Sequence, residues 1–176
     1  MCAEQTGEAG NQFFDEDIPW ADATVRRDYE AALGRCIRHF NQLDNLLGDI
    51  LKTVLQRLGR SDMVEEYVYR ADFSQRVRVL DLLRHSTEGQ GIARVSVNDL
   101  RSVAGERNLL SHAHFEENPS SSEYRLVNRK GRTEQDYTAE RIDGVTRRIS
   151  EAWSALRYVE TYYAFADVSL LPDPEA

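Results

Sequence analysis

Apolar residues recur every three or four positions along several stretches of this chain, which is the spacing of a helix that buries one face. The clearest stretch lies between residues 25 and 58. Its apolar stripe consists of Val25, Tyr29, Leu33, Cys36, Phe40, Leu43, Leu47, Ile50, Val54 and Leu58. Gly59 is a typical stop signal. At ~1.5 Å per residue we predict a helix about 50 Å long, with Gly34 and Gly48 as the candidate positions for a bend or break.

Three further stretches show the same period, each after a residue that can cap a helix. The second helix is predicted within "DFSQRVRVLDLLRHS", residues 72–86, with Asp72 or Ser74 as its cap; the next begins at Ser96, and the last has Thr138 as its cap. The segment 61–71 is a short helix or a turn. The three stripes are Phe73, Val77, Leu80 and Leu83; Leu100, Val103, Ala104, Arg107 and Ser111; and Ile142, Val145, Ile149, Trp153, Leu156, Val159 and Tyr163.

The period changes after His112. "HAHFEE" and "EYRLVNRKG" are rich in residues that favour strands, and the turn-forming "NPSSS" separates them, so we predict a β-hairpin. The expected fold is therefore all-α, an antiparallel bundle of four to five helices with a small β-hairpin inserted before the last long helix. We expect a flexible tail over residues 1–22, one helical domain over 23–167 and a second tail over 168–176.

Composition limits the classes of function. Apolar residues make up 41% of the 176 residues, which is enough for a core, and the formal net charge is −8. An acidic chain is not expected to bind nucleic acid broadly, although a small basic site remains open. The sequence has neither a membrane-spanning apolar run nor a secretory signal at its start. Cys2 and Cys36 do not form a disulfide framework, so we expect a cytoplasmic protein that needs no cofactor.

Arg107 interrupts an otherwise apolar stripe. With about 100° of rotation per residue and Leu100 at zero, Arg107 lies at roughly −20°, where a leucine would pack better. A buried guanidinium without a partner costs several kcal/mol. One interpretation is an ion pair with Asp44, which follows Leu43 in the first helix and could fix the register between helices. The other is a groove that is open to water.

The neighbours of Arg107 add a chemical hypothesis. Asn108 and His112 are four residues apart and share a helical face next to Arg107. An arginine can bind a phosphate, an amide can position a hydroxyl or a ring, and a histidine can transfer a proton near neutral pH. One histidine cannot act as both acid and base in a single step, whereas two copies related by a two-fold axis can supply both groups.

Weaker candidates lie around this group. Asp44, Ser111 and His114 are candidate binding residues. His112 and His114 form an H-x-H pattern, but only Glu116 offers itself as a third ligand, so we predict no metal site.

The motif "RNLLSH" has the form Arg, polar residue, three variable residues, His, and it resembles the signature of the HEPN superfamily. "FNQLDNLLGDIL" and "DFSQRVRVLDLL" are similar to stretches in small bacterial HEPN-like proteins, and the resemblance covers roughly residues 28–165. It implies a helical bundle whose motif residues are Arg107, Asn108 and His112. Many such proteins are metal-independent endoribonucleases of toxin or defence systems with a site at a homodimer interface. Others bind RNA or nucleotide, or are interaction modules, and the partner protein can be encoded separately.

Two hypotheses follow. The first is a dimeric RNA-directed protein in which Arg107 and His112 are open to solvent in a cleft. The second is a non-catalytic interaction module in which Arg107 is buried against Asp44 and His112 faces away. Leu109 points opposite the inward stripe, at roughly 180°. A leucine there favours an outer face that is covered by the hairpin or by a second subunit.

Overall fold

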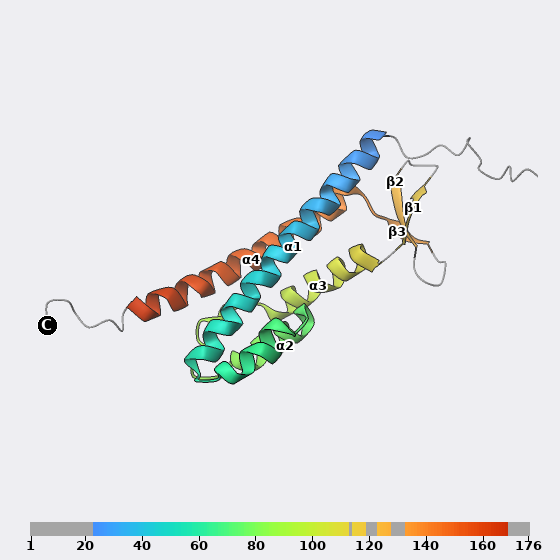
Figure 1. Ribbon diagram of the computed structural model, residues 1–176. Helices are drawn as coiled ribbons and strands as arrows, with labels where there is room; N and C mark the ends of the chain where they lie inside the picture. The colour runs from blue at the N-terminus through green and yellow to red at the C-terminus, as the bar shows by residue number, and fades with distance from the viewer. Residues whose placement is uncertain (1–22, 113, 119–122, 128–132, 169–176) are drawn as a thin grey trace, which may run out of the picture.

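The computed structural model describes residues 23–112, 114–118, 123–127 and 133–168 (Figure 1). These residues are mostly helical, as expected from the spacing of apolar residues. The α-helices are α1 (Ala23–Arg57), α2 (Phe73–Leu83), α3 (Val97–His112) and α4 (Ala139–Val168). The predicted tail over 1–22 lies outside the described residues, as does the C-terminal tail from residue 169 onward.

Helix α1 runs without a break past both glycines at which a bend was considered. Gly48 lies where α1 contacts the segment before α2, and a Cβ atom there would meet Val68 at 3.6 Å and Arg76 at 3.7 Å. These are ordinary van der Waals distances, so the helix neither bends at Gly48 nor excludes a Cβ atom there.

The directions of the helices differ from a simple antiparallel bundle. Arg35 near the start of α1 forms an ion pair with Asp143 near the start of α4, and Arg57 at the end of α1 lies over the ring of Tyr163 near the end of α4. These two long helices therefore run in the same direction, as Figure 1 shows. A 3₁₀ turn (Ser61–Met63) and a π-helical turn (Glu65–Tyr69) lead back along α1, so that α2 starts beside the middle of α1.

Helix α3 is antiparallel to α2. Phe73 at the start of α2 lines the same pocket as Arg107, whereas Asp81 near its end forms an ion pair with Arg101. The last turn of α3 therefore extends past the beginning of α2. This explains one error of the helical-wheel prediction: Ser111 is exposed and Leu110 is buried, because no α2 side chain remains to cover the face that carries Ser111.

Trp153 differs from its predicted environment, whereas Leu109 is partly covered. Trp153 was placed in the inward stripe of α4, but 38% of it is exposed, and Ala152 and Leu156 are the buried residues there. Leu109 was expected on an outer face covered by the hairpin or by a second subunit, and it is half-buried and packs against the core of the same chain. Burial of Leu109 therefore does not require a second subunit.

Between α3 and α4 the structure has three short antiparallel strands, where two strand-favouring runs were predicted. They are β1 (His114–Asn118), β2 (Glu123–Val127) and β3 (Thr133–Asp136), in the order β1-β2-β3. Tyr124 of β2 stacks on Tyr29 of α1, with 4.1 Å between ring centroids. This contact attaches the sheet to the first turns of α1.

The predicted helix caps are observed. Asp72, rather than Ser74, caps α2, because its side chain accepts a hydrogen bond from the Gln75 backbone N–H at 2.8 Å. The Ser96 hydroxyl accepts from the backbone of Asp99, and the Thr138 hydroxyl accepts from the backbone of Arg141. Each cap satisfies one donor that the first turn of a helix leaves without an intrahelical partner.

Candidate functional site

A pocket of about 260 Å³ lies between the middle of α1, the start of α2 and the second half of α3. The three helices meet here because α2 begins beside the middle of α1, opposite the second half of α3. The polar residues that line it are Asp44, Asp72, Ser74, Arg107 and Asn108, and the rings of Phe40 and Phe73 form its apolar part. The two rings are in contact, with centroids 4.7 Å apart. The pocket thus combines charged groups of both signs with an aromatic wall.

Arg107 contributes a guanidinium that no carboxylate neutralises within the described residues. It is half-buried, and its Cζ atom lies 5.2 Å from the centroid of the Phe40 ring. Its Nη1 donates to Asn108 Oδ1 at 3.2 Å, while its buried Nε has no hydrogen-bond partner there. Cation–π contact with Phe40 offsets part of the cost of burial, but it does not replace hydrogen-bond acceptors.

The comparison with the other arginines makes Arg107 distinctive. Four arginines are half-buried in the described part of the chain. Arg57 pairs with Glu88 at 2.8 Å, Arg76 with Asp44 at 2.6 Å and Arg84 with Asp81 at 3.5 Å. Arg107 is the one among these four that forms no ion pair.

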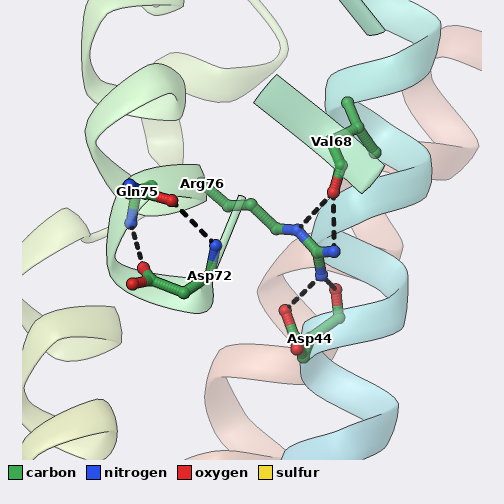
Figure 2. Close-up of polar contacts among 5 residues, drawn as sticks. All are labelled: Asp44, Val68, Asp72, Gln75 and Arg76. Atoms are coloured by element: carbon green, nitrogen blue, oxygen red, sulfur yellow. Dashed lines mark hydrogen bonds and ion pairs between the residues drawn. The ribbon is translucent and has the colours of Figure 1, made fainter. Parts of the chain in front are cut away.

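The predicted ion pair between Asp44 and Arg107 is therefore wrong, because Asp44 is bound to Arg76 (Figure 2). Arg76 Nη1 donates to Asp44 Oδ1, and Nε and Nη2 donate to the backbone oxygen of Val68 at 2.9 and 2.6 Å. Arg76 clamps α1, the π-helical turn and α2 together. The sequence could have indicated this role of Arg76. Arg76 lies three residues after Phe73 and so falls on the apolar side of α2, just as Arg107 falls on the apolar side of α3.

The two carboxylates of the pocket each keep one oxygen available. Asp44 uses Oδ1 for Arg76, and Asp72 uses Oδ1 for the cap of α2. Among the described residues, no hydrogen bond reaches Oδ2 of either side chain, and neither pairs with Arg107. Figure 2 shows Asp72 and Gln75 completing the capping box, in which the Asp72 backbone N–H donates to Gln75 Oε1 at 3.0 Å.

Two of the other predicted residues, Ser111 and His112, do not line this pocket. His112 and Ser111 are exposed in the last turn of α3, beyond the beginning of α2. Asn108 is exposed at the mouth of the pocket, and helical geometry places it on the same face as His112. His114 begins β1, and its side chain is outside what the structure describes. The pocket brings together Arg107, Asn108 and Asp44, and the imidazole of His112 lies one turn further along.

A second polar cluster fixes the orientation of α3 and was not predicted. Glu106 Oε2 accepts from the Tyr137 hydroxyl at 2.8 Å, and Oε1 accepts from Arg148 at 3.1 Å. Burial opposes ionisation of Glu106, but the hydrogen bonds from Tyr137 and Arg148 outweigh it and lower the pKa of this carboxyl group. Burial, and then the bond to Glu106, raises the pKa of Tyr137 to about 12. Because Glu106 is held toward α4, its neighbour Arg107 is directed toward α1 and α2.

The described residues contain neither a metal-binding cluster nor a membrane-spanning helix. No three His, Cys, Asp or Glu side chains in the described ranges lie close enough to bind a metal ion together. No helix in those ranges is both long and apolar enough to pass through a bilayer.

The second half of α3 therefore presents a guanidinium with unused donors, an amide and an exposed imidazole. Asp44 of α1 and Asp72 at the cap of α2 each add a carboxylate with one oxygen that accepts no hydrogen bond from the described residues. Such a set can hold a polar ligand by hydrogen bonds to several walls of the pocket. Compared with known proteins, the chain matches no family model, no curated protein and no solved structure.

Proposed function

We propose that this chain is a cytoplasmic HEPN-like protein that binds RNA at the mouth of the Arg107 pocket. We further propose that it acts as a homodimer and cleaves RNA without a metal ion, in a toxin or defence system. The proposal combines the Arg-polar-x3-His motif with the surroundings of its three residues. The proposal thus has two steps, which are binding of RNA and cleavage of the bound RNA.

The observation that carries the proposal is the guanidinium of Arg107, which is half-buried beside an open pocket with no carboxylate partner among the described residues. A structural arginine in a helical bundle is normally paired, because an unpaired buried charge is destabilising. A phosphate can supply the missing acceptors, since the guanidinium fork matches its oxygens. Arg107 therefore has the properties of a ligand-binding residue.

The residues of α3 around the bound phosphate have the groups that cleavage of the RNA backbone needs. Arg107 binds the phosphate and stabilises negative charge on its oxygens during transfer. Asn108 positions the 2′-hydroxyl, whose oxygen attacks the phosphorus while the bond from phosphorus to the 5′-oxygen breaks. His112 either takes the proton of the 2′-hydroxyl or gives one to the departing 5′-oxygen. A second subunit supplies the second proton-transfer group in this proposal. The net charge of −8 means that binding is local to this site rather than spread over the surface.

A second candidate function rests on a different observation. Tyr158, Tyr162 and Phe165 of α4 are 55%, 40% and 69% exposed and are spaced by four and three residues. They form one stripe, which is typical of a surface that binds another protein. This is the alternative of a non-catalytic interaction module. It is weakened at Arg107, because the structural ion pair that it required with Asp44 is absent from the described residues.

The experiment that tests the proposal measures both cleavage and binding of mixed RNA in the presence of EDTA. We compare the wild type with Arg107→Ala, His112→Ala and the control Arg147→Ala, which removes an exposed arginine of α4. Cleavage should fall at least a hundredfold in the first two variants, and the control should retain it. Cleavage that survives both substitutions contradicts the mechanism. Absence of both cleavage and RNA binding in the wild type contradicts the proposal as a whole.

A further inference from the structure

The pocket beside Arg107 keeps opposite charges apart. A guanidinium and two carboxylates line the same 260 Å³ cavity, yet within the described residues no ion pair joins Arg107 to Asp44 or to Asp72. Such groups usually make contact when the chain allows it. Here Asp44 is bound to Arg76, and Asp72 is bound in the cap of α2. The cavity therefore presents hydrogen-bond donors on one wall and acceptors on another.

The charges of the pocket favour a neutral ligand. Arg107, Asp44 and Asp72 line the pocket, and Arg76, which does not line it, neutralises Asp44 through their ion pair, so the formal sum over these four groups is zero. An inorganic phosphate in the interior would face both carboxylates, and a metal ion would face Arg107. A neutral heterocycle with donors on one edge and acceptors on another meets neither repulsion. The volume is below the roughly 300–1,000 Å³ that is typical of drug-sized ligands, which suits a single ring system.

We propose that this pocket binds a guanine base of the RNA, an inference that rests on the proposed function. Guanine is the RNA base that offers two adjacent donors, N1–H and the N2 amino group, and two carboxylate oxygens can accept from them. The unused oxygens of Asp72 and Asp44 are the acceptors. The Ser74 hydroxyl and one N–H of Arg107 donate to O6 and N7, the acceptors that arginine commonly binds on guanine.

Arg107 can serve the base and the chain of the RNA together. Its guanidinium has five N–H donors, of which one is used by Asn108. The base enters the pocket between the carboxylates and the aromatic wall, while the adjoining phosphate remains at the mouth near Asn108. The pocket thus selects which phosphate lies beside His112, because it holds the nucleotide next to that phosphate.

The first test uses the unmodified protein and five nucleotides. We measure dissociation constants by titration calorimetry for the 3′-monophosphates of guanosine, inosine, adenosine, cytidine and uridine. Guanosine 3′-monophosphate should bind at least tenfold more tightly than the adenosine, cytidine and uridine compounds. Inosine lacks the N2 amino group and should bind severalfold more weakly than guanosine. Equal affinity for guanosine and adenosine, or for guanosine and inosine, overturns the inference.

The second test uses Asp72→Asn. Asparagine also caps helices well and retains an oxygen for the Gln75 backbone N–H, so α2 should remain folded, which a melting curve checks. The variant should lose the preference for guanosine, with its affinity falling about tenfold to that of the other nucleotides. A preference that survives Asp72→Asn overturns the assignment of this carboxylate.

The outcomes separate the two proposals. RNA binding that depends on Arg107 but shows no base preference removes the guanine site and leaves the proposed function standing. If none of the nucleotides binds and Arg107→Ala leaves RNA binding unchanged, both proposals are wrong. Loss of guanosine preference in Asp72→Asn, with RNA cleavage retained at reduced selectivity, supports both.

Discussion

Arg76 should be one of the most sensitive positions for stability outside the apolar core. The substitution Arg76→Met removes the guanidinium that joins Asp44 of α1 to the Val68 backbone oxygen and retains a similar hydrophobic stem. The variant leaves the Val68 oxygen and the Asp44 carboxylate without their donor. The side chain of Arg76 is 16% exposed and that of Asp44 is 31% exposed, so water reaches these groups only in part.

The expected loss follows from these contacts. A hydrogen bond to a charged group contributes about 1.5–3 kcal/mol, and bonds made by one side chain are not additive. Water can replace part of the lost interaction at the more exposed Asp44. We therefore expect Arg76→Met to lower the free energy of unfolding by about 3 kcal/mol. At roughly 2–4 °C per kcal/mol for a chain of this size, Tm should fall by about 6–12 °C.

Urea unfolding followed by circular dichroism measures this loss. Arg78→Met is the matched control, because Arg78 is exposed on the same helix, and its free energy of unfolding should change by less than about 0.5 kcal/mol. Arg76→Lys should give an intermediate result, since an ammonium group cannot span both acceptors in the same geometry. If Arg76→Met and Arg78→Met have the same free energy of unfolding, the clamp does not stabilise the fold as described.

Three other predictions test separate parts of the structure. The pKa of Tyr137 is raised from 10.0 to about 12, so stability present below pH 10 should be lost between pH 10 and 12, by up to about 3 kcal/mol. Tyr137→Phe should show a smaller loss over that range in pH-dependent unfolding, and an identical loss would contradict the assignment. In thermal melts, Gly91→Ala should lower the free energy of unfolding by about 1–3 kcal/mol, because its Cβ atom would lie 2.6 Å from the Tyr162 side chain. Gly144→Ala has open space around the new Cβ atom, so in the same thermal melts it should be neutral or stabilise the fold by up to about 1 kcal/mol. RNA affinity should depend weakly on salt, with a slope of log K against log salt near −1 for contacts centred on Arg107, and a slope steeper than about −4 would indicate a broad basic surface instead.

The spacing of apolar residues predicted the helices well because that spacing is a local property. The stripe of α1 and the caps Ser96 and Thr138 are observed as expected. Where a stripe fails, the reason is a neighbour that the wheel does not contain. Ser111 is exposed because α2 begins only beside Arg107, and Trp153 is exposed because Ala152 and Leu156 occupy the contact face of α4.

Of the residues predicted for the site, Arg107, Asn108 and Asp44 line the pocket, but the ion pair of Asp44 differs from the prediction. A helical wheel shows that Arg107 points inward, but it does not show which helix lies opposite or at what height. Asp44 lines the same pocket as Arg107, but it pairs with Arg76. Arg76 lies in the first turn of α2, which begins at Phe73 beside the middle of α1. Strand β3 was missed because "TEQD" has no alternation of apolar and polar residues.

The affinity of the chain for a short single-stranded RNA, measured by fluorescence anisotropy before and after Arg107→Ala, tests the central claim most directly. The account predicts at least a tenfold weaker affinity for Arg107→Ala, with Arg147→Ala indistinguishable from the wild type and both variants equally folded. Equal affinities for all three proteins would show that the unpaired guanidinium does not hold RNA.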